Sequence, residues 1–325
     1  MFCCIPARSQ AQVSRLGPRP RYPGSVSRLA SLRQMSELTV ASFNVHGGVD
    51  GWGRRIPVVE CAANLDADVL VLQEVFAPDG GESTADEIAA LTGMKVAADL
   101  VLARAQITPG DPPTSKQWRP LPVVGPPPAM VVHRFEMDRP TEKLRRKRPE
   151  PVGRGTRRGT WSLAVLSRLP VVDVSVLDLG RLPSDKAKRL LAVVDVDVGE
   201  RSLTVVGAHM SHLSSGSPVQ FSKLRRELTE LGRPAVLVGD MNLWGPPTCA
   251  LLPGWARAVK GLTWPAWRPI AQPDHILVRP PVEVIRGEVV RNGGGSDHLP
   301  VRATLRIDQN EATLRIDQND QKRSQ

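Results

Sequence analysis

AVLVGDMN, at residues 235–242, is a short apolar run that ends in two polar side chains, Asp240 and Asn242. A run of this length without polar alternation predicts a strand that is buried on both faces. The stretch DVLVLQE, at residues 68–74, has the same character and ends at Glu74. Two such strands need cover on both sides, which favours sheets packed in layers.

Strand and helix signals alternate outward from these two runs. Helices are predicted at residues 56–65, at 84–91 with a capping box of Thr84 and Glu87, and at 219–231. Strands are predicted at residues 38–43, 68–74, 161–167, 171–177, 190–198, 202–209, 235–240, 276–278, 282–290 and 301–307. The mixture of meanders and crossover helices predicts an α/β (α+β) fold in which sheets pack face to face with helices outside.

The length of 325 residues fits one large domain or two small ones. We place the domain at residues 36–307, with an irregular Pro- and Arg-rich insertion at about 105–160. Residues 1–35 are rich in Ser, Arg and Pro without periodicity, which predicts a disordered basic extension. The sequence ATLRIDQN occurs at 303–310 and again at 312–319, so residues 308–325 are interpreted as a duplicated, disordered tail.

The net charge of +10 is concentrated in two segments. Residues 1–35 hold six arginines and no acid, and residues 134–159 hold ten Lys or Arg against four acids. The rest of the chain is therefore slightly acidic, which argues against a catalytic body built to bind a nucleic-acid duplex tightly. The Arg-rich insertion is interpreted either as a solvated loop or as a clamp on phosphates.

The cysteines and the apolar residues together predict a cytoplasmic protein. Cys3, Cys4, Cys61 and Cys249 show neither metal-ligand spacing nor the density of a disulfide framework. No apolar run approaches the roughly 20 residues of a membrane-spanning helix, and no secretory signal follows the first arginines. We therefore expect free thiols and no membrane span.

Polar side chains gather where the predicted strands end. Five clusters lie at the C-terminal edge of a strand or in the turn beyond it: Asn44 with His46, Glu74, His209 with His212, Asp240 with Asn242, and Asp297 with His298. A sixth, Asp274 with His275, immediately precedes a strand. Charged groups are rarely buried without partners, so we expect these side chains to converge at one rim of the sheets.

These residue types fit metal-assisted phosphate chemistry. Mg²⁺ prefers carboxylate, amide and water oxygens, so Glu74 is the first candidate ligand. Attack by water needs a base, and the charge that develops on phosphate oxygens needs donors. His298 and His209 suit these roles, with Asp274 as the carboxylate that orients a histidine. The asparagine amides of the same clusters can donate as well.

Seven motifs occur in order along the chain. They are FNVHGG (43–48), LVLQEVF (70–76), LAVLSRLP (163–170), VVGAHMSH (205–212), LVGDMNLW (237–244), PDHILV (273–278) and GGSDHLPV (294–301). This ordered set, from about residue 38 to residue 305, resembles the endonuclease/exonuclease/phosphatase superfamily, also called the deoxyribonuclease I-like family. The resemblance implies a four-layer sandwich in which helices flank two packed mixed β-sheets.

The resemblance also implies a role for each matching residue. Metal binding, with Mg²⁺ or Mn²⁺ as the cofactor, would fall to Asn44, Glu74 and Asp297. The catalytic residues would be His209 on the scissile phosphate, Asp240 on the attacking water, Asn242 on the phosphate, and Asp274 paired with His298. The single tyrosine, Tyr22, lies outside the matched region, which weakens an assignment as an abasic-site nuclease.

Four further residues are candidates for substrate binding, namely His46, His212, Trp264 and Arg157. The two histidines are interpreted either as supports of the site or as incidental. Trp264 is interpreted as a packing residue or as a platform on which a base stacks, since tryptophan carries a large apolar area.

The sequence thus predicts a monomeric, divalent-metal-dependent phosphoesterase that hydrolyses phosphodiester or phosphomonoester bonds. A nuclease is the first substrate hypothesis, with nucleic acid as a candidate partner. A small-molecule or lipid-headgroup phosphatase or phosphodiesterase is the alternative, because the fold does not choose between these substrates. A non-catalytic phosphate-binding module is the alternative from another class, and the presence of every polar motif residue argues against it.

Overall fold

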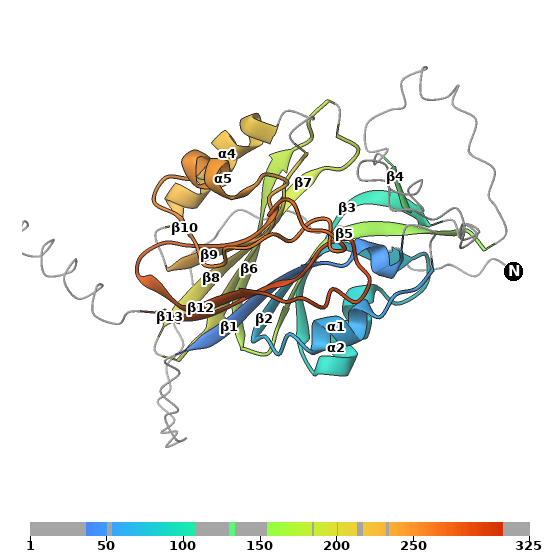
Figure 1. Cartoon of the computed structure of the whole chain (residues 1–325), viewed down its shortest axis with the longest axis horizontal. Helices are drawn as coiled ribbons and strands as arrows, with labels where there is room; N and C mark the ends of the chain where they lie inside the picture. Colours follow the sequence, from blue (N-terminus) through green and yellow to red (C-terminus); the bar gives the residue numbers. More distant parts are fainter. Residues whose placement is uncertain are drawn as a thin grey trace, which may run out of the picture. The chain divides into compact units, whose positions relative to one another are not determined.

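The computed structural model describes residues 37–50, 54–107, 130–133, 155–183, 185–199, 201–212, 217–231 and 234–307. These residues form two β-sheets (Figure 1). The seven-stranded first sheet has the order β12 (Val282–Val289), β13 (Val301–Ile307), β1 (Leu38–Asn44), β2 (Val69–Pro78), β5 (Arg157–Ser167), β3 (Lys95–Ile107) and β4 (Met130–His133). The six-stranded second sheet has the order β10 (Ala256–Arg257), β11 (Asp274–Val278), β9 (Ala235–Asp240), β8 (Ser202–His209), β7 (Arg189–Asp197) and β6 (Val171–Gly180).

Both sheets are mixed. The pairs β1–β2 and β8–β9 are parallel, and every other described pair is antiparallel. Parallel neighbours need a crossover between them, and helices provide it here: α1 (Val58–Ala63) connects β1 to β2, and α4 (Ser217–Glu230) connects β8 to β9. The other helices in the described ranges are α2 (Thr84–Thr92), α5 (Gly245–Leu251) and the 3₁₀ turn η1 (His46–Gly48).

Three apolar clusters hold four layers together. The alternating side chains of each central strand divide between two of them, because neighbours along a strand point to opposite faces. On β1, Val40 lies in the cluster between the sheets, whereas Phe43 packs with Ile88 of α2. On β9, Val238 faces the first sheet, and Leu237 packs with Phe221 of α4. The predicted four-layer sandwich is therefore confirmed, with α1 and α2 on one outer face and α4 and α5 on the other (Figure 1).

The capping residue of one helix was predicted incorrectly. In the structure α2 begins at Thr84, so the capping residue is Ser83: its hydroxyl accepts from the Asp86 N–H at 3.1 Å, and the Asp86 carboxylate accepts from the Ser83 N–H at 2.9 Å. The capping box predicted from Thr84 and Glu87 was therefore wrong by one residue. Ser83 and Thr84 are both good capping residues, and the last extended residue before the helix decides between them.

Strand β3 was not predicted at all, although it is the longest in the structure. Its N-terminal half carries no regular alternation of buried and exposed side chains, and two bulges interrupt its pairing with β5. Strands β3 and β5 extend into the segment of about 105–160 that was predicted to be irregular, and β4 lies within it. Most of that segment, the extension at 1–35 and the tail at 308–325 lie outside the described residues.

No helix in the described part of the chain is long and apolar enough to cross a bilayer.

Candidate active site

Four of the predicted site residues continue the inner faces of their strands, at the end of the core between the sheets. Residues two apart on a strand share a face, so Asn44 shares the face of the core residue Val40. The same relation holds for His209, Asp240 and Asp274 on β8, β9 and β11. The polar groups therefore form one end of the layer in which the two sheets meet.

Strand register brings three of these side chains into one row. Strands β8 and β9 run parallel with His209 opposite Asp240, and β9 and β11 run antiparallel with Asp274 opposite Asp240. Asp240 thus lies between its two neighbours on the second sheet. All three side chains are buried.

A β-bulge places Glu74 in the site. Leu72 packs on the helix-covered face of β2, and regular alternation would send Glu74 to the same face. The register with β5 shifts between Leu72 and Val75, and Glu74 takes a left-handed backbone conformation with φ of 57°. The extra residue re-aims the carboxylate, which accepts a hydrogen bond of 3.2 Å from the Asn44 amide.

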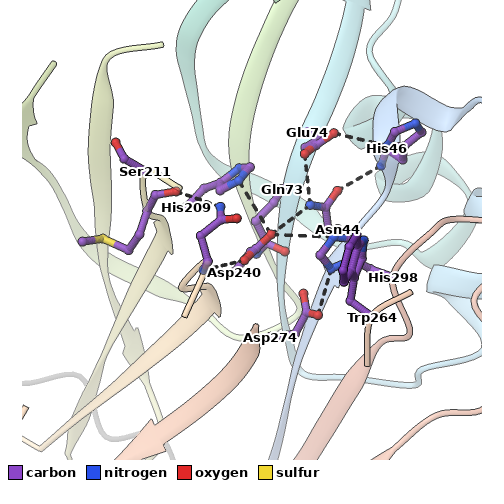
Figure 2. Close-up of polar contacts among 12 residues, drawn as sticks. Asn44, His46, Gln73, Glu74, His209, Ser211, Asp240, Trp264, Asp274 and His298 are labelled. Atoms are coloured by element: carbon purple, nitrogen blue, oxygen red, sulfur yellow. Dashed lines mark hydrogen bonds and ion pairs between the residues drawn. The ribbon is translucent and has the colours of Figure 1, made fainter. Parts of the chain in front are cut away.

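Asn44 connects the two sheets. Its Nδ2 donates to Glu74 Oε1 on the first sheet and to Asp240 Oδ2 on the second, both at 3.2 Å (Figure 2). Its Oδ1 accepts from the backbone N–H of His46 at 3.1 Å. The Ser296 hydroxyl donates to the Asn44 carbonyl at 2.7 Å, which ties the end of β1 to the segment that carries Asp297.

His46 lies between two carboxylates. Its Nδ1 is 3.5 Å from Glu74 Oε2 and 3.2 Å from Asp297 Oδ1. Burial opposes a charge on His46, but the carboxylates of Asp297 and Glu74 outweigh it and raise the pKa of His46 to about 9. Burial likewise opposes ionisation of Glu74, yet the hydrogen bond and charge of His46 lower the pKa of Glu74 well below its usual range. His46, predicted only as a substrate-binding candidate, is therefore part of the acidic centre.

His298 forms the second charged pair of the site. Its Nδ1 lies 2.8 Å from Asp274 Oδ2, which also accepts from the Thr263 hydroxyl at 2.6 Å. Its Nε2 lies 3.9 Å from Asp240 Oδ2. Burial opposes protonation of His298, but Asp274 and Asp297 overcome this effect and raise its pKa well above the usual value.

His209 has the opposite electrostatic surroundings. Its Nε2 lies 3.7 Å from Asp240 Oδ2. Burial, and after it the nearby charge of Arg189, lowers the pKa of His209 to about 4. The surroundings therefore favour the neutral imidazole at His209 and the protonated form at His298, and both rings approach the same carboxylate oxygen.

The donor set fits a divalent cation in two neighbouring arrangements. Ligand atoms of Asp240, Asp274 and His298 lie within 4.8 Å of one another. The carboxylates of Glu74 and Asp297 also converge, on the single point where His46 Nδ1 lies. Oxygen atoms are the ligands that Mg²⁺ prefers. Each arrangement offers two carboxylates; those of the first include Asp274, which pairs with His298, and those of the second converge on His46.

Two buried carboxylate oxygens support a cation as well. Asp274 Oδ1 has no hydrogen-bond partner among the described residues, and Asp297 Oδ1 has none there beyond its 3.2 Å ion pair with His46 Nδ1. A buried unpartnered carboxylate oxygen is costly unless an ion or water satisfies it. The acidic centre is therefore chemically suited to hold Mg²⁺ or Mn²⁺.

The remaining predicted residues lie at different distances from this centre. Asn242, with φ of 49°, donates its backbone N–H to Asp240 Oδ1 at 2.8 Å and its side-chain amide to the Met210 carbonyl at 2.9 Å. Trp264 Nε1 donates to Asp297 Oδ2 at 3.3 Å. Arg157 lies on β5 with its guanidinium over the Phe76 ring at 5.8 Å, and His212 is exposed beyond the end of β8.

Sequence reasoning missed the residues that support the site. Thr263 and Ser296 hold the Asp274 carboxylate and the Asn44 carbonyl, and Arg189 lies beside His209. No spacing in the sequence distinguishes these side chains from other polar residues of the chain. Their contacts are long-range, so only the fold reveals them.

Two packed mixed sheets with an acidic, asparagine- and histidine-containing centre at one end define the class of this protein. A family model described as Endonuclease/Exonuclease/phosphatase family matches residues 41–298. The chain belongs to this family, and the resemblance seen in its motifs is confirmed.

Solved structures of the same fold share little sequence with the chain. An endonuclease/exonuclease/phosphatase from Beutenbergia cavernae is 21% identical, with a TM-score of 0.52, covering 84% of this chain and 72% of that one. A family protein from Leptotrichia buccalis is 12% identical, with a TM-score of 0.54, covering 83% of this chain and 100% of that one. TDP2 from C. elegans is 16% identical, with a TM-score of 0.52, covering 83% and 75%. No curated protein matches the chain.

Proposed function

We propose that this protein is a divalent-metal-dependent phosphoesterase that hydrolyses phosphodiester or phosphomonoester bonds. The observation that carries the proposal is the convergence of Glu74 and Asn44 from the first sheet with Asp240 and Asp274 from the second. Acidic groups drawn from both sheets into one buried centre, beside a protonated His298, suit a cation and a phosphate.

The metal would be held by Asn44, Glu74 and Asp297, with Mg²⁺ or Mn²⁺ as the ion. When bound, it would neutralise the charge that develops on the phosphate oxygens. Asp240 would orient the attacking water and accept its proton, since its Oδ2 lies 3.7 Å from His209 Nε2 and 3.9 Å from His298 Nε2.

The two histidines would act differently because their charges differ. His298, held by Asp274, would stabilise the phosphate oxygens or protonate the leaving group from its imidazolium form. His209, which stays neutral, would donate one N–H to the phosphate, with an amide N–H of Asn242 beside it. Pairs of titratable groups whose surroundings push their pKa values apart are typical of acid and base chemistry.

A nuclease remains the first substrate hypothesis. The family description itself includes endonuclease and exonuclease activities, and the Arg-rich residues 134–159 would supply charge for a polyanion. Arg157 and Arg158 are described members of that group, both on β5, and the Arg157 guanidinium lies over the ring of Phe76, two residues after Glu74.

One structural observation favours phospholipid headgroups as a second substrate class. The loop that follows Trp264 presents Trp267 and Ile270 with 59% and 65% of their surfaces exposed. It is fastened to the site by a 2.7 Å hydrogen bond from the Ala266 N–H to the Asp297 carbonyl. An aliphatic side chain such as Ile270 does not stack on bases, whereas tryptophan with aliphatic and basic neighbours suits a lipid interface.

A substrate panel with and without metal tests the proposal. Single-stranded and duplex DNA, RNA, inositol phosphates, sphingomyelin and a soluble aryl phosphodiester would be offered with Mg²⁺, with Mn²⁺ and with chelator. We expect turnover of at least one ester that vanishes with chelator. Undiminished turnover in chelator would refute the metal-dependent mechanism, and no turnover of any ester would favour a non-catalytic phosphate-binding module.

Loss of His298 should be far more damaging than loss of a histidine elsewhere. His298→Ala should lower kcat by about 10² or more, the scale of general acid or base catalysis. His133, which lies on the edge strand β4, provides the matched control, and His133→Ala should retain wild-type turnover. A His298→Ala protein within about twofold of the wild type would remove His298 from the reaction, since catalysis of this kind is worth at least 10².

A further inference from the structure

A buried ion pair lies directly behind His209 and has no part in the proposed chemistry. Asp185 and Arg189 are 6% and 7% exposed, and they pair through Arg189 Nε to Asp185 Oδ2 at 2.8 Å and Arg189 Nη2 to Asp185 Oδ1 at 3.2 Å. Two parallel bonds fix the plane of the guanidinium. Asp185 lies just before β7 and Arg189 is its first residue, on the strand that pairs with β8.

Arg189 holds His209 at two places. Its third nitrogen, Nη1, donates to the His209 backbone carbonyl at 3.3 Å. Its guanidinium also lies over the ring of Trp161, 5.4 Å from the ring centroid. The Trp161 ring in turn packs against the imidazole of His209, with 5.1 Å between the centroids. Arg189 therefore fixes the main chain of His209 directly, and it supports the His209 ring through Trp161.

Asp185 fixes the residues that follow His209. Its Oδ2 accepts a hydrogen bond from the Ser211 hydroxyl. The Ser211 N–H donates to Gln220 Oε1 on α4 at 3.2 Å, and Gln220 Nε2 donates to the Gly180 carbonyl at 3.4 Å. The end of β8 is thus tied to the β6–β7 connection and to α4.

Stability alone does not explain a charged pair in this place. Removing an arginine and an aspartate from water costs several kcal/mol per ion, and well-packed apolar residues of similar size often stabilise a fold as well or better. What a guanidinium offers instead is direction, because its planar fork can serve a carboxylate, a carbonyl and an aromatic face at the same time. All three are engaged here, and all three lead to His209.

We propose that Arg189 is a positioning residue that, with Asp185 and Trp161, sets the place of the His209 imidazole against Asp240 and the substrate phosphate. The inference rests on the proposed phosphoesterase function, in which His209 donates to that phosphate. His209 Nε2 now lies 3.7 Å from Asp240 Oδ2, so a movement of its ring would change its reach to the phosphate directly.

Arg189 variants test the proposal by turnover of the soluble aryl phosphodiester with Mg²⁺. Arg189→Met, which keeps the length and loses the fork, should lower kcat by about 10- to 100-fold, because a misplacement near 1 Å can cost 10². KM should change much less. Arg189→Lys should recover part of the loss, because an ammonium can still pair with Asp185 but cannot serve the carbonyl and the Trp161 face together.

The chain provides a matched control at the other end of the second sheet. Arg279 lies over the Trp255 ring at 5.1 Å and donates through Nη1 to the Leu228 carbonyl at 3.0 Å, the same two kinds of contact. It follows the last residue of β11, whereas Asp274 in the site is the first. Arg279→Met should lower the unfolding midpoint without lowering kcat. An equal loss of kcat in both variants would overturn a positioning role for Arg189.

A double-mutant cycle separates positioning from general damage. If Arg189 acts through His209, then adding Arg189→Met to a His209→Ala protein should lower kcat by less than about twofold, because effects of residues that act as a unit do not add. A full additional loss in that background would overturn the proposal.

Nuclear magnetic resonance of the metal-free protein tests the positioning role of Arg189 independently of the proposed phosphoesterase activity. The ring resonances of His209 should shift and broaden in Arg189→Met and stay unchanged in Arg279→Met. Unchanged His209 resonances in Arg189→Met would refute positioning even if activity fell. A wild-type protein that turns over no phosphate ester would refute the proposed function, whereas the resonance test would still decide whether Arg189 fixes the ring.

Discussion

A single carboxylate oxygen organises the site at the level of residues. Asp240 Oδ2 accepts from Asn44 at 3.2 Å and lies 3.7 Å from His209 and 3.9 Å from His298. The two histidines differ in pKa because Arg189 adds positive charge near one and acidic residues surround the other. Burial alone would keep both imidazoles neutral.

His275 should make the protein sensitive to acid. Burial lowers its pKa to about 4, so between pH 6.5 and 4 the unfolded chain binds a proton that the folded chain does not. This stabilisation is complete above pH 6.5 and is lost as the pH falls toward 4. His275→Gln, which can still donate to the Leu243 carbonyl, should lose about 3 kcal/mol less than the wild type between pH 7 and pH 4.

Denaturant unfolding in chelator at both pH values measures this difference. His275 faces away from Asp274, its neighbour in the site, because adjacent residues on β11 point to opposite faces. Equal losses of unfolding free energy in the variant and the wild type would show that His275 does not carry the effect.

Residue identities in the site were largely predictable, whereas their partners were not. The polar residues at strand ends stand out against apolar runs, so Asn44, Glu74 and Asp240 could be named from the sequence. The sequence could not predict that His46 lies between two carboxylates, because Glu74 and Asp297 are far from each other in sequence. The individual roles of these residues stay predictions.

At the level of elements, the bulge in β2 is the feature that the pattern of apolar and polar residues did not predict. LVLQEVF reads as one continuous strand, and a strictly regular strand would hide Glu74 under α2. The shift between Leu72 and Val75 depends on the pairing with β5, a strand more than 80 residues later. The unbroken apolar run of β9 and the helical periodicity of α4 predicted these elements well, whereas β3 and the short proline-containing α5 were missed.

Gly239 should be essential for the parallel pair β8–β9. A Cβ at this position would lie 1.9 Å from the Ala208 carbonyl oxygen, and its φ of +148° is one that other residues rarely adopt. Gly239→Ala should therefore lower the free energy of unfolding by more than about 2 kcal/mol, because backbone must move. It should also lower activity, since Asp240 is the next residue.

Gly93, at the end of α2, provides the control for this substitution. Its φ is +70°, and a Cβ there would meet no atom within 4 Å. Gly93→Ala should cost only the strain of a left-handed residue, about 1 kcal/mol, and should leave activity intact. Calorimetry of the two variants side by side would measure both costs, and equal costs would contradict the close approach at Gly239.

At the scale of the whole molecule, the site depends on both sheets. The second sheet is built from one continuous part of the chain, from β6 to β11, whereas the first sheet is begun by β1 to β5 and completed by β12 and β13. Asn44 and Glu74 come from the beginning of this path, Asp240 and Asp274 from its middle, and Asp297 and His298 from the segment before β13.

Mg²⁺ should stabilise the folded protein, because the acidic centre exists only when both sheets are assembled. At a concentration about 100 times its Kd, the ion should add about 3 kcal/mol to the free energy of unfolding. Glu74→Gln should reduce this gain. Thermal unfolding with MgCl₂, compared with NaCl at the same ionic strength, measures it, and an equal response to both salts would contradict a specific site.

The position of β13 has a consequence for biosynthesis. It pairs with β1, with Leu305 opposite Leu38, so β1 cannot gain this neighbour until residues 301–307 have been synthesised. His298 precedes β13 by only a few residues. During synthesis, Glu74 is therefore added to the chain long before His298. A polypeptide interrupted before residue 298 therefore lacks a residue of the proposed site, and synthesis must pass this residue before the groups from β1, β2 and the segment before β13 can come together.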